Sequence, residues 1–256
     1  MSTLSGPSDR PEPTSPIRPE PKPAIWPPRT FLGTLSEGSR DGLLSLGAFR
    51  EYAAGTRVIL EGDTSTHVIA MHGGWVKVIA ETEYGSQALL ALRSRGELVG
   101  EQAALEGEPR SASVITASVV TGYVIQRLDF LRYLGEHPDV HIEVTRALSG
   151  KLRMATRRLI DFSGLPAHVR LARVLSELAR MNSRQTSEGT ELGYTLTQPE
   201  LAAMVGVSEP SMQRALRRLR ESGVLGTGYR KIFIRDTAAL DAIAGPDWTG
   251  GPQPLR

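Results

Sequence analysis

The sequence predicts an α+β fold in three parts: an N-terminal antiparallel β-roll or barrel, one long helix, and a C-terminal helix-turn-helix followed by a β-hairpin. Three patterns support this fold. From Phe49 to about Arg127, short alternating apolar runs are separated by glycines, which is typical of strands joined by tight turns. Residues 140–163 repeat apolar or small side chains at heptad spacing. Residues 197–222 contain two helix patterns on either side of Gly206.

Length and composition narrow the class of protein. A chain of 256 residues predicts two domains plus tails. The absence of cysteine excludes disulfides, thiolate zinc sites and cysteine-ligated iron–sulfur clusters. No apolar run reaches 18 residues and the N-terminus has no apolar signal core, so we expect a cytoplasmic protein without a membrane partner.

The first 48 residues contain a tail and then a helical pattern. Residues 1–28 are dense in Pro, Ser and Glu and cannot bury enough apolar surface to fold, so a disordered or polyproline-like tail is expected. Trp26 is a candidate to pin the end of this tail to the first domain. Residues 30–48 look helical, and the strand pattern begins at Phe49.

Glycines punctuate the strand region where turns are needed. The runs TRVILEG, HVIAMHGGWVKVIAE, ALLALRSRGELVG, SASVITAS and TGYVIQ are spaced like the strands of a roll or barrel. The glycines at the expected turns are Gly55, Gly62, Gly73, Gly74, Gly85 and Gly96.

Residues 96–119 combine side chains suited to a ligand with a sugar and a phosphate. Gly100 can adopt unusual backbone angles and allows a close approach, and the Glu101 carboxylate can accept hydrogen bonds from sugar hydroxyls. The planar guanidinium of Arg110 matches a phosphate, and Ser111 adds a hydroxyl. The amides that start a short helix near residues 102–105 would add donors. The alternative is a surface loop in which Arg110 pairs with Glu101 or Glu108.

The middle of the chain is predicted to be helical. A short helix over 128–137 ends at Pro138, and a long helix covers about 140–163. Its heptad seam consists of Thr145, Leu148, Leu152, Ala155, Leu159 and Phe162. Such a stripe packs against another helix, either in a second copy of the chain or within the same subunit. Gly164 and Pro166 break the helix and predict a hinge.

The region after the hinge predicts two further helical units. A helix over 167–181 is followed by a polar loop, 182–193, and a short strand, 194–197. Thr197 and Glu200 form a capping-box pair, Gly206 allows the turn, and Ser208 caps the next helix. Residues 224–236 predict two short strands around a turn, which makes the helix-turn-helix a winged one, and Asp236 is positioned to cap a last short helix.

The charge distribution separates the two halves of the chain. Residues 29–140 hold 10 basic and 14 acidic residues, whereas residues 141–235 hold 16 basic and 8 acidic ones. The second helix of the helix-turn-helix presents an arginine-rich face. A basic back half therefore indicates a polyanion as partner, with a merely solvated basic face as the alternative.

Taken in this order, the phosphate-and-ribose motif, the heptad seam and the basic helix-turn-helix resemble the Crp/Fnr superfamily over about residues 30–240. The motif Gly100-Glu101 with Arg110-Ser111-Ala112 is similar to the family's phosphate-binding cassette. The resemblance implies five segments: a tail (1–28), a cyclic-nucleotide-binding β-roll (29–139), a dimerisation helix with hinge (140–164), a winged helix-turn-helix DNA-binding domain (165–244) and a flexible tail (245–256).

The resemblance also implies a ligand, partners and site residues. The ligand would be a cyclic nucleotide, cyclic AMP or a related one, and the partners would be a double-stranded DNA operator, a second copy of the chain and RNA polymerase. The implied ligand contacts are Gly100, Glu101, Gln102, Arg110, Ser111, Ala112, Ala155 and Thr156. The implied DNA contacts are Thr197, Gln198, Ser208, Glu209, Ser211, Gln213, Arg214, Arg217 and Arg218. No catalytic residues and no metal site are expected, because neither a nucleophile–base set nor a metal-ligand cluster stands out.

Two departures from the cyclic-AMP-binding members of the family keep alternatives open. Ala155-Thr156 replaces a pair of hydroxyl residues that contact adenine, and Glu209 and Pro210 replace base-reading residues at the start of the recognition helix. One alternative is therefore the same DNA-binding scaffold without a nucleotide effector. Another is a cyclic-nucleotide module that regulates a partner protein or an enzyme.

Overall fold

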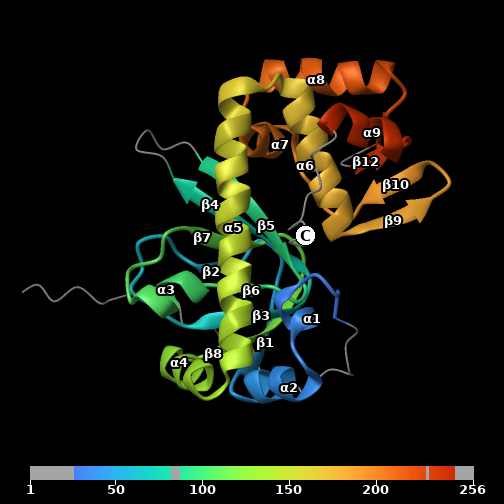
Figure 1. Cartoon of the computed structure of the whole chain (residues 1–256). Coiled ribbons are helices and arrows are strands. Elements are labelled where there is room, and N and C mark those ends of the chain that lie inside the picture. The colour runs from blue at the N-terminus through green and yellow to red at the C-terminus, as the bar shows by residue number, and fades with distance from the viewer. Residues whose placement is uncertain (1–25, 82–86, 229–230, 246–256) are drawn as a thin grey trace, which may run out of the picture.

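The computed structural model describes residues 26–81, 87–228 and 231–245. Figure 1 shows a β-roll at one end, the long helix α5 running along the molecule, and a mixed helical and β domain at the other end. The predicted α+β fold and the order of its three parts are confirmed. No helix in the described part of the chain is long and apolar enough to cross a membrane.

Two four-stranded antiparallel sheets form the roll. One has the order β1-β8-β3-β6, and the other has the order β2-β7-β4-β5. The strands are β1 (Ala48–Tyr52), β2 (Arg57–Ile59), β3 (Val68–Gly73), β4 (Trp75–Glu81), β5 (Gln87–Ser94), β6 (Leu98–Val99), β7 (Ser113–Thr116) and β8 (Val120–Ile125). Apolar side chains of both sheets, among them Ile69 of β3 and Val114 of β7, fill the space between them.

The helical stretch predicted for residues 30–48 is two short helices, α1 (Phe31–Thr34) and α2 (Glu37–Ser45). Leu35 is extended, with ψ 147°, and the Ser36 hydroxyl then caps α2 by accepting from the Ser39 amide. The helical prediction for this range therefore holds for two separate helices, because Ser36 starts a new one, and it fails at its end, where Ala48 already belongs to β1. Trp26 does pack on the roll, edge to face with His72 and beneath the Arg95 guanidinium.

Helix α4 (Arg127–Glu136) leads directly into α5 (Pro138–Gly164). Pro138 occupies the first turn of α5, where its missing N–H has no intrahelical partner to lose, so the long helix starts two residues before the predicted position. Val140 and Val144 anchor the first turns of α5 to the roll. Further along, Leu152 and Leu159 are 68% and 69% exposed, so this part of the heptad seam has no partner within the described residues, whereas Leu148 packs partly against the core of the roll.

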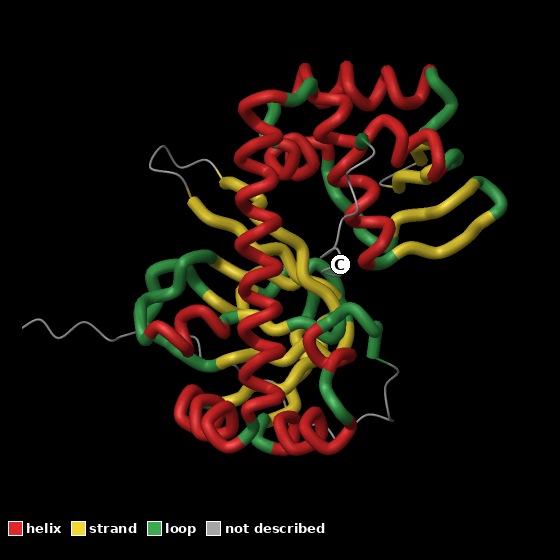
Figure 2. The backbone as a smooth tube through the Cα atoms, viewed as in Figure 1, coloured by secondary structure: helices red, strands yellow, loops and turns green. Residues whose placement is uncertain are grey.

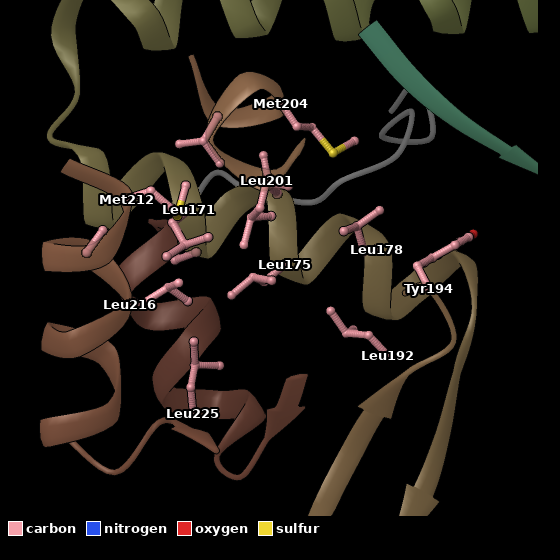
Figure 3. Packing of buried hydrophobic residues seen from close by; sticks show 14 of the residues in the cluster. Leu171, Leu175, Leu178, Leu192, Tyr194, Leu201, Met204, Met212, Leu216 and Leu225 are labelled. Atoms are coloured by element: carbon pink, nitrogen blue, oxygen red, sulfur yellow. The ribbon is translucent and has the colours of Figure 1, made fainter. Parts of the chain in front are cut away.

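The C-terminal domain is built on α6 (Ala167–Met181), whose apolar face meets α7 (Gln198–Val205), α8 (Glu209–Glu221) and α9 (Thr237–Ala244). Figure 3 shows Leu171 and Leu175 of α6 beside apolar side chains of α7 and α8, and Leu178 near Leu192 and Tyr194. Here the predicted helix-turn-helix and the hairpin that follows it are both present.

The polar segment before α7 differs from the prediction. Residues 182–193 form a hairpin, β9 (Ser183–Thr186) and β10 (Gly189–Leu192), instead of a loop, and residues 194–197 are not a strand. Glu191 explains why so polar a hairpin is stable: it pairs with Arg184 at 2.7 Å and with Lys231 at 3.0 Å. The hairpin joins β11 (Leu225–Gly228) and β12 (Lys231–Ile234) in a sheet of order β11-β12-β10-β9.

The C-terminal domain contacts the roll directly as well as through α5. Trp75 of β4 meets Tyr194 edge to face, with ring centroids 5.1 Å apart, and the Lys77 ammonium pairs with Glu200 of α7. Leu89 and Leu92 of β5 belong to the same buried cluster as the core of the C-terminal domain. Figure 2 shows the β4–β5 pair extending from the roll toward this domain. The arrangement of the two ends is therefore fixed by packing and not by the hinge alone.

Candidate functional site

Gly100 and Arg110 form the centre of the first candidate site, the cassette (residues 100–112). Gly100 has φ +81°, and a Cβ at this position would lie 2.6 Å from Arg110 Nη1 and 2.9 Å from the His67 carbonyl oxygen. A side chain would therefore both strain the backbone and displace the arginine. The guanidinium reaches this position because the residue at 100 is glycine.

The partners of the Arg110 guanidinium are neutral. Its Nη1 donates to Gly100 O at 2.8 Å, Nη2 to His67 O at 2.7 Å and Nε to Ser65 Oγ at 3.3 Å. Arg110 is only 3% exposed, and burial lowers its pKa although Asp63 and Glu101 act against this. Arg110 does not form the ion pair with Glu101 or Glu108 that a plain surface loop would need. A buried guanidinium with neutral hydrogen-bond partners keeps a positive charge that an anion could neutralise.

Glu101 is paired with a residue that the sequence did not point to. Lys151 of α5 donates to Glu101 Oε1 at 2.7 Å and to the Leu98 carbonyl at 3.0 Å. Burial lowers the pKa of Lys151, whereas the Glu101 carboxylate acts to raise it. This ion pair connects the cassette to the long helix.

Of the remaining residues predicted to bind the ligand, some lie next to this centre and others lie further away on α5. Ser111 is exposed and its hydroxyl donates to Gln102 at 3.4 Å, and Ala112 immediately precedes β7. Ala155 and Thr156 are exposed on α5, one turn beyond Lys151, and no described contact connects them to the cassette. The structure therefore brings together Gly100, Glu101 and Arg110, with Lys151 in addition.

The second candidate site is the exposed side of α7 and α8. The capping box at the start of α7 is present: the Thr197 hydroxyl accepts from Glu200 N, and the Glu200 carboxylate accepts from Thr197 N. Gly206 has φ +68°, which the tight turn requires, and a Cβ there would meet the Phe162 ring of α5 at 2.6 Å. Ser208 precedes α8, but its hydroxyl contacts Ser211 Oγ at 3.1 Å, so its predicted role as a side-chain cap was wrong.

The predicted DNA contacts share one feature, which is access to solvent. Met212, Leu216 and Leu219 hold α8 in the core, whereas the opposite face of α8 is open. The exposed members of the predicted set are Thr197, Gln198, Ser208, Glu209, Gln213, Arg214, Arg217 and Arg218, and Ser211 is half-buried. Figure 1 shows α8 at the end of the molecule away from the roll. An exposed helix with four arginines between Arg214 and Arg220 can meet a polyanion along that stretch.

Two family models match the chain in the same order as these sites. The model for the cyclic nucleotide-binding domain matches residues 49–137, and the model for the Crp-like helix-turn-helix domain matches residues 169–243. The combination of these two modules defines a DNA-binding transcription regulator.

The curated relatives include regulators named for cyclic AMP and a fumarate and nitrate reduction regulator. The cyclic AMP receptor protein of Thermus thermophilus is 29% identical over 204 residues, which is 80% of this chain and 91% of the relative. The CRP-like cAMP-activated global transcriptional regulator of Mycobacterium tuberculosis is 24% identical, covering 74% and 85%. The fumarate and nitrate reduction regulatory protein of Escherichia coli is 26% identical, covering 75% and 76%. This chain belongs to the Crp/Fnr superfamily of transcription regulators.

Solved structures share the fold. The c-di-GMP responsive global regulator CLP of Xanthomonas campestris aligns with a TM-score of 0.68 at 24% identity, over 79% of this chain and all of that one. A transcriptional regulator of the CRP family from Thermus thermophilus aligns with a TM-score of 0.67 at 22% identity, over 79% of this chain and 100% of its own. Both alignments show that this chain shares the fold of these regulators.

Proposed function

We propose that the protein is a dimeric regulator whose operator binding is controlled by a cyclic nucleotide, cyclic AMP or a related one, in the cassette. The observation that carries this proposal is Arg110, a buried guanidinium whose approach requires Gly100 and whose partners are neutral. A cyclic phosphodiester would supply the missing negative charge, and its two free oxygens suit a planar pair of donors.

The other cassette residues have roles that follow from this placement. Glu101 would accept from the ribose 2′-hydroxyl, and Ser111 and Gln102, both exposed beside Arg110, would assist at the phosphate and ribose edge. Ala112 leaves room for the phosphate, and Ala155 and Thr156 would face the base from α5. Because Lys151 already holds Glu101, the ligand's ribose must share or replace that ion pair. Ligand binding would therefore act directly on the long helix.

The exposed face of α8 would enter the major groove of the operator. Ser211, Gln213 and Arg214 lie in its first turns, where side chains reach base edges, while Arg217 and Arg218 are further along and suit phosphates. Thr197 and Gln198 at the start of α7, with Ser208 before α8, would lie against the DNA backbone, and Glu209 would face a base edge because phosphates repel its carboxylate. Two copies joined along α5 would present two such helices to two half-sites, with RNA polymerase as a further partner at the promoter.

The proposed roles of the roll, of α5 and of the C-terminal domain also set the segment boundaries. We propose a tail over residues 1–28, a nucleotide-binding domain over 29–139, a dimerisation helix with hinge over 140–164, a DNA-binding domain over 165–244 and a tail over 245–256.

Calorimetric titration with cyclic AMP, cyclic GMP and cyclic di-GMP tests the ligand. Arg110→Ala should weaken binding of the accepted nucleotide by about 2–5 kcal/mol, because it removes the cation proposed for the phosphate and leaves the phosphate charge without its partner. Arg132→Ala, which removes an exposed arginine of α4, is the matched control and should bind like wild type. Equal affinities for Arg110→Ala and wild type would remove the cassette from ligand binding.

A second candidate is the same DNA-binding scaffold without a nucleotide effector. The Lys151–Glu101 ion pair favours it, since the carboxylate meant for the ribose is already satisfied, and Ala155 lacks a hydroxyl for the base. In that case none of the three nucleotides would bind, while selection of DNA from a random pool would return one consensus with or without them.

A further inference from the structure

A shallow pocket lies between the start of α6 and the exposed face of α8. Its volume is about 210 Å³. The residues lining it are Ala167, His168, Ser211, Arg214, Ala215 and Arg218. Figure 1 shows that the first turn of α6 lies beside α8, at the end of the molecule away from the roll. The pocket is thus at the edge of the helix that the proposed function places on DNA.

The pocket carries positive charge without a compensating acid. Arg214 and Arg218 are exposed, and within the described residues neither pairs with a carboxylate. Arg214 donates to Ser211 Oγ at 2.8 Å, which turns its guanidinium toward the pocket side of α8. The Arg218 guanidinium and the His168 imidazole make this depression a site for a compact anion with several acceptor oxygens, while Arg214 and Ser211, which the proposed function directs to base edges, border it.

We propose that this pocket receives one phosphodiester group of the operator backbone and that His168 takes up a proton when it does, so that operator binding strengthens as the pH falls. The proposal rests on the proposed function, because the occupant is chosen by the position of the pocket next to the DNA-reading face of α8. A nucleic-acid phosphate is the anion that would arrive at this edge while α8 lies in the groove.

The direction of the pH dependence follows from the surroundings of His168. In the free protein, burial and then the positive charge of Arg218 lower the pKa of His168, so its imidazole is neutral near pH 7. The charged groups facing it in the pocket are Arg214 and Arg218, and no carboxylate lines the pocket to favour the imidazolium. A bound phosphodiester reverses this balance and raises the pKa of His168.

The linkage between proton uptake and DNA binding then fixes the sign of the pH dependence. The complex holds more protons than the free protein, so affinity rises as the pH falls through the pKa of His168 in the complex and levels off below the pKa in the free protein. Because the phosphodiester raises the pKa of His168, we expect operator affinity to gain about three- to tenfold for each half-site as the pH falls. A dimer on two half-sites would gain about the square of that factor.

Fluorescence anisotropy on a duplex selected from a random pool, at constant ionic strength between pH 6 and pH 8, measures this directly. Wild type should gain affinity toward pH 6 by the factors above, with saturating cyclic AMP present if the protein requires it. His168→Gln keeps a polar side chain but cannot be protonated, so its profile should be flatter by that factor. His141→Gln removes an exposed histidine of α5 and is the control that should follow wild type.

A variant with a permanent positive charge at residue 168 shows that a change in binding does not come from unfolding. His168→Arg carries a permanent charge, so it should bind at pH 8 about as tightly as wild type does at pH 6. Identical pH profiles for His168→Gln and wild type would overturn the inference alone. Failure of wild type to bind any duplex at low salt would overturn the proposed function, and the phosphate site with it.

Discussion

Gly100 shows how a single missing side chain can set up a site. Its φ of +81° and the 2.6 Å separation of a virtual Cβ from Arg110 Nη1 are two independent reasons for glycine. Gly55 provides a natural comparison, since its φ is +83° but nothing lies within 4 Å of its virtual Cβ. Comparing substitutions at Gly55 and Gly100 therefore distinguishes the cost of backbone strain from the cost of displacing Arg110.

We therefore expect Gly55→Ala to lower the free energy of unfolding by about 1–2 kcal/mol, which is the cost of a left-handed conformation with a side chain. Gly100→Ala should cost more, because the His67 carbonyl 2.9 Å away belongs to the backbone and cannot move aside freely. It should also weaken binding of the nucleotide that the proposed site accepts at least about tenfold, while Gly55→Ala leaves that binding unchanged. Denaturant unfolding and calorimetry check both, and equal ligand affinity in the two variants would contradict the steric argument.

At the residue level, the sequence revealed the cassette because its chemistry is local. Gly100, Glu101 and Arg110 lie within eleven positions. Their residue types indicate a close backbone approach, a hydroxyl acceptor and a phosphate partner. Lys151 was missed because it is 50 residues from Glu101, and a lysine on a long helix has no local pattern that marks an inward orientation. The one usable signal was its position one helical turn before Ala155, on the side expected to face the cassette.

The long helix α5 is the element whose surface is least explained by a single chain. Leu152, Leu159 and Ile160 are all more than 60% exposed, although they are large apolar residues on one helix. Phe162, predicted to be part of the same seam, instead packs partly on Gly206 and beneath Arg170 of its own chain. The seam proposed for dimerisation is therefore the stretch before Phe162.

The double variant Leu152→Glu with Leu159→Glu should dissociate the proposed dimer into monomers, because two carboxylates per helix would have to be buried without partners. Arg153→Glu is the matched control, since it changes the charge of an exposed neighbour outside the seam. Light scattering or sedimentation measures the outcome. A dimer that stays intact in the double variant would place the interface elsewhere.

Sequence patterns predicted an element well where a repeat or a cap extends over adjacent residues. They predicted it poorly where polar contacts between distant residues stabilise the element. The 27-residue helix α5 and the capping box at Thr197 both followed from spacing. The β9–β10 hairpin did not, because its stability comes from Glu191 and from pairing with β12, which is distant in sequence. The break at Leu35–Ser36 was readable as a serine cap but was hidden by apolar residues on both sides.

On the scale of the whole molecule, the cassette and the DNA-reading helices are connected by more than the hinge. Strand β7 begins at Ser113, directly after the cassette, and pairs with β4, which carries Trp75 and Lys77 to the C-terminal domain. Arg158 of α5 adds a second connection, since it donates to the Leu90 carbonyl of β5 and to Glu177 of α6. The contacts of Trp75, Lys77 and Arg158 with the C-terminal domain could not be read from the sequence, because each joins segments that are predicted as separate domains.

The Lys77–Glu200 ion pair is the most accessible part of this connection to test. Lys77→Glu places two carboxylates together at the start of α7, so the C-terminal domain should separate from β4 and β5. We expect faster amide exchange in β4 and β5 and a larger radius of gyration in solution, with the roll still folded. Because the pair is partly exposed, its direct contribution is about 1 kcal/mol or less, and most of the effect comes from repulsion.

A second substitution shows whether repulsion is the cause. Glu200→Gln keeps an oxygen that can accept from Thr197 N, so the cap of α7 survives while the negative charge is removed. Added to Lys77→Glu, it should restore slow exchange in β4 and β5. If Lys77→Glu alone leaves exchange and radius at the wild-type values, the apolar contacts of Trp75, Tyr194 and Leu92 hold the two parts together without the ion pair. If the double variant remains open, the lysine stem and its packing near Trp75 matter more than its charge.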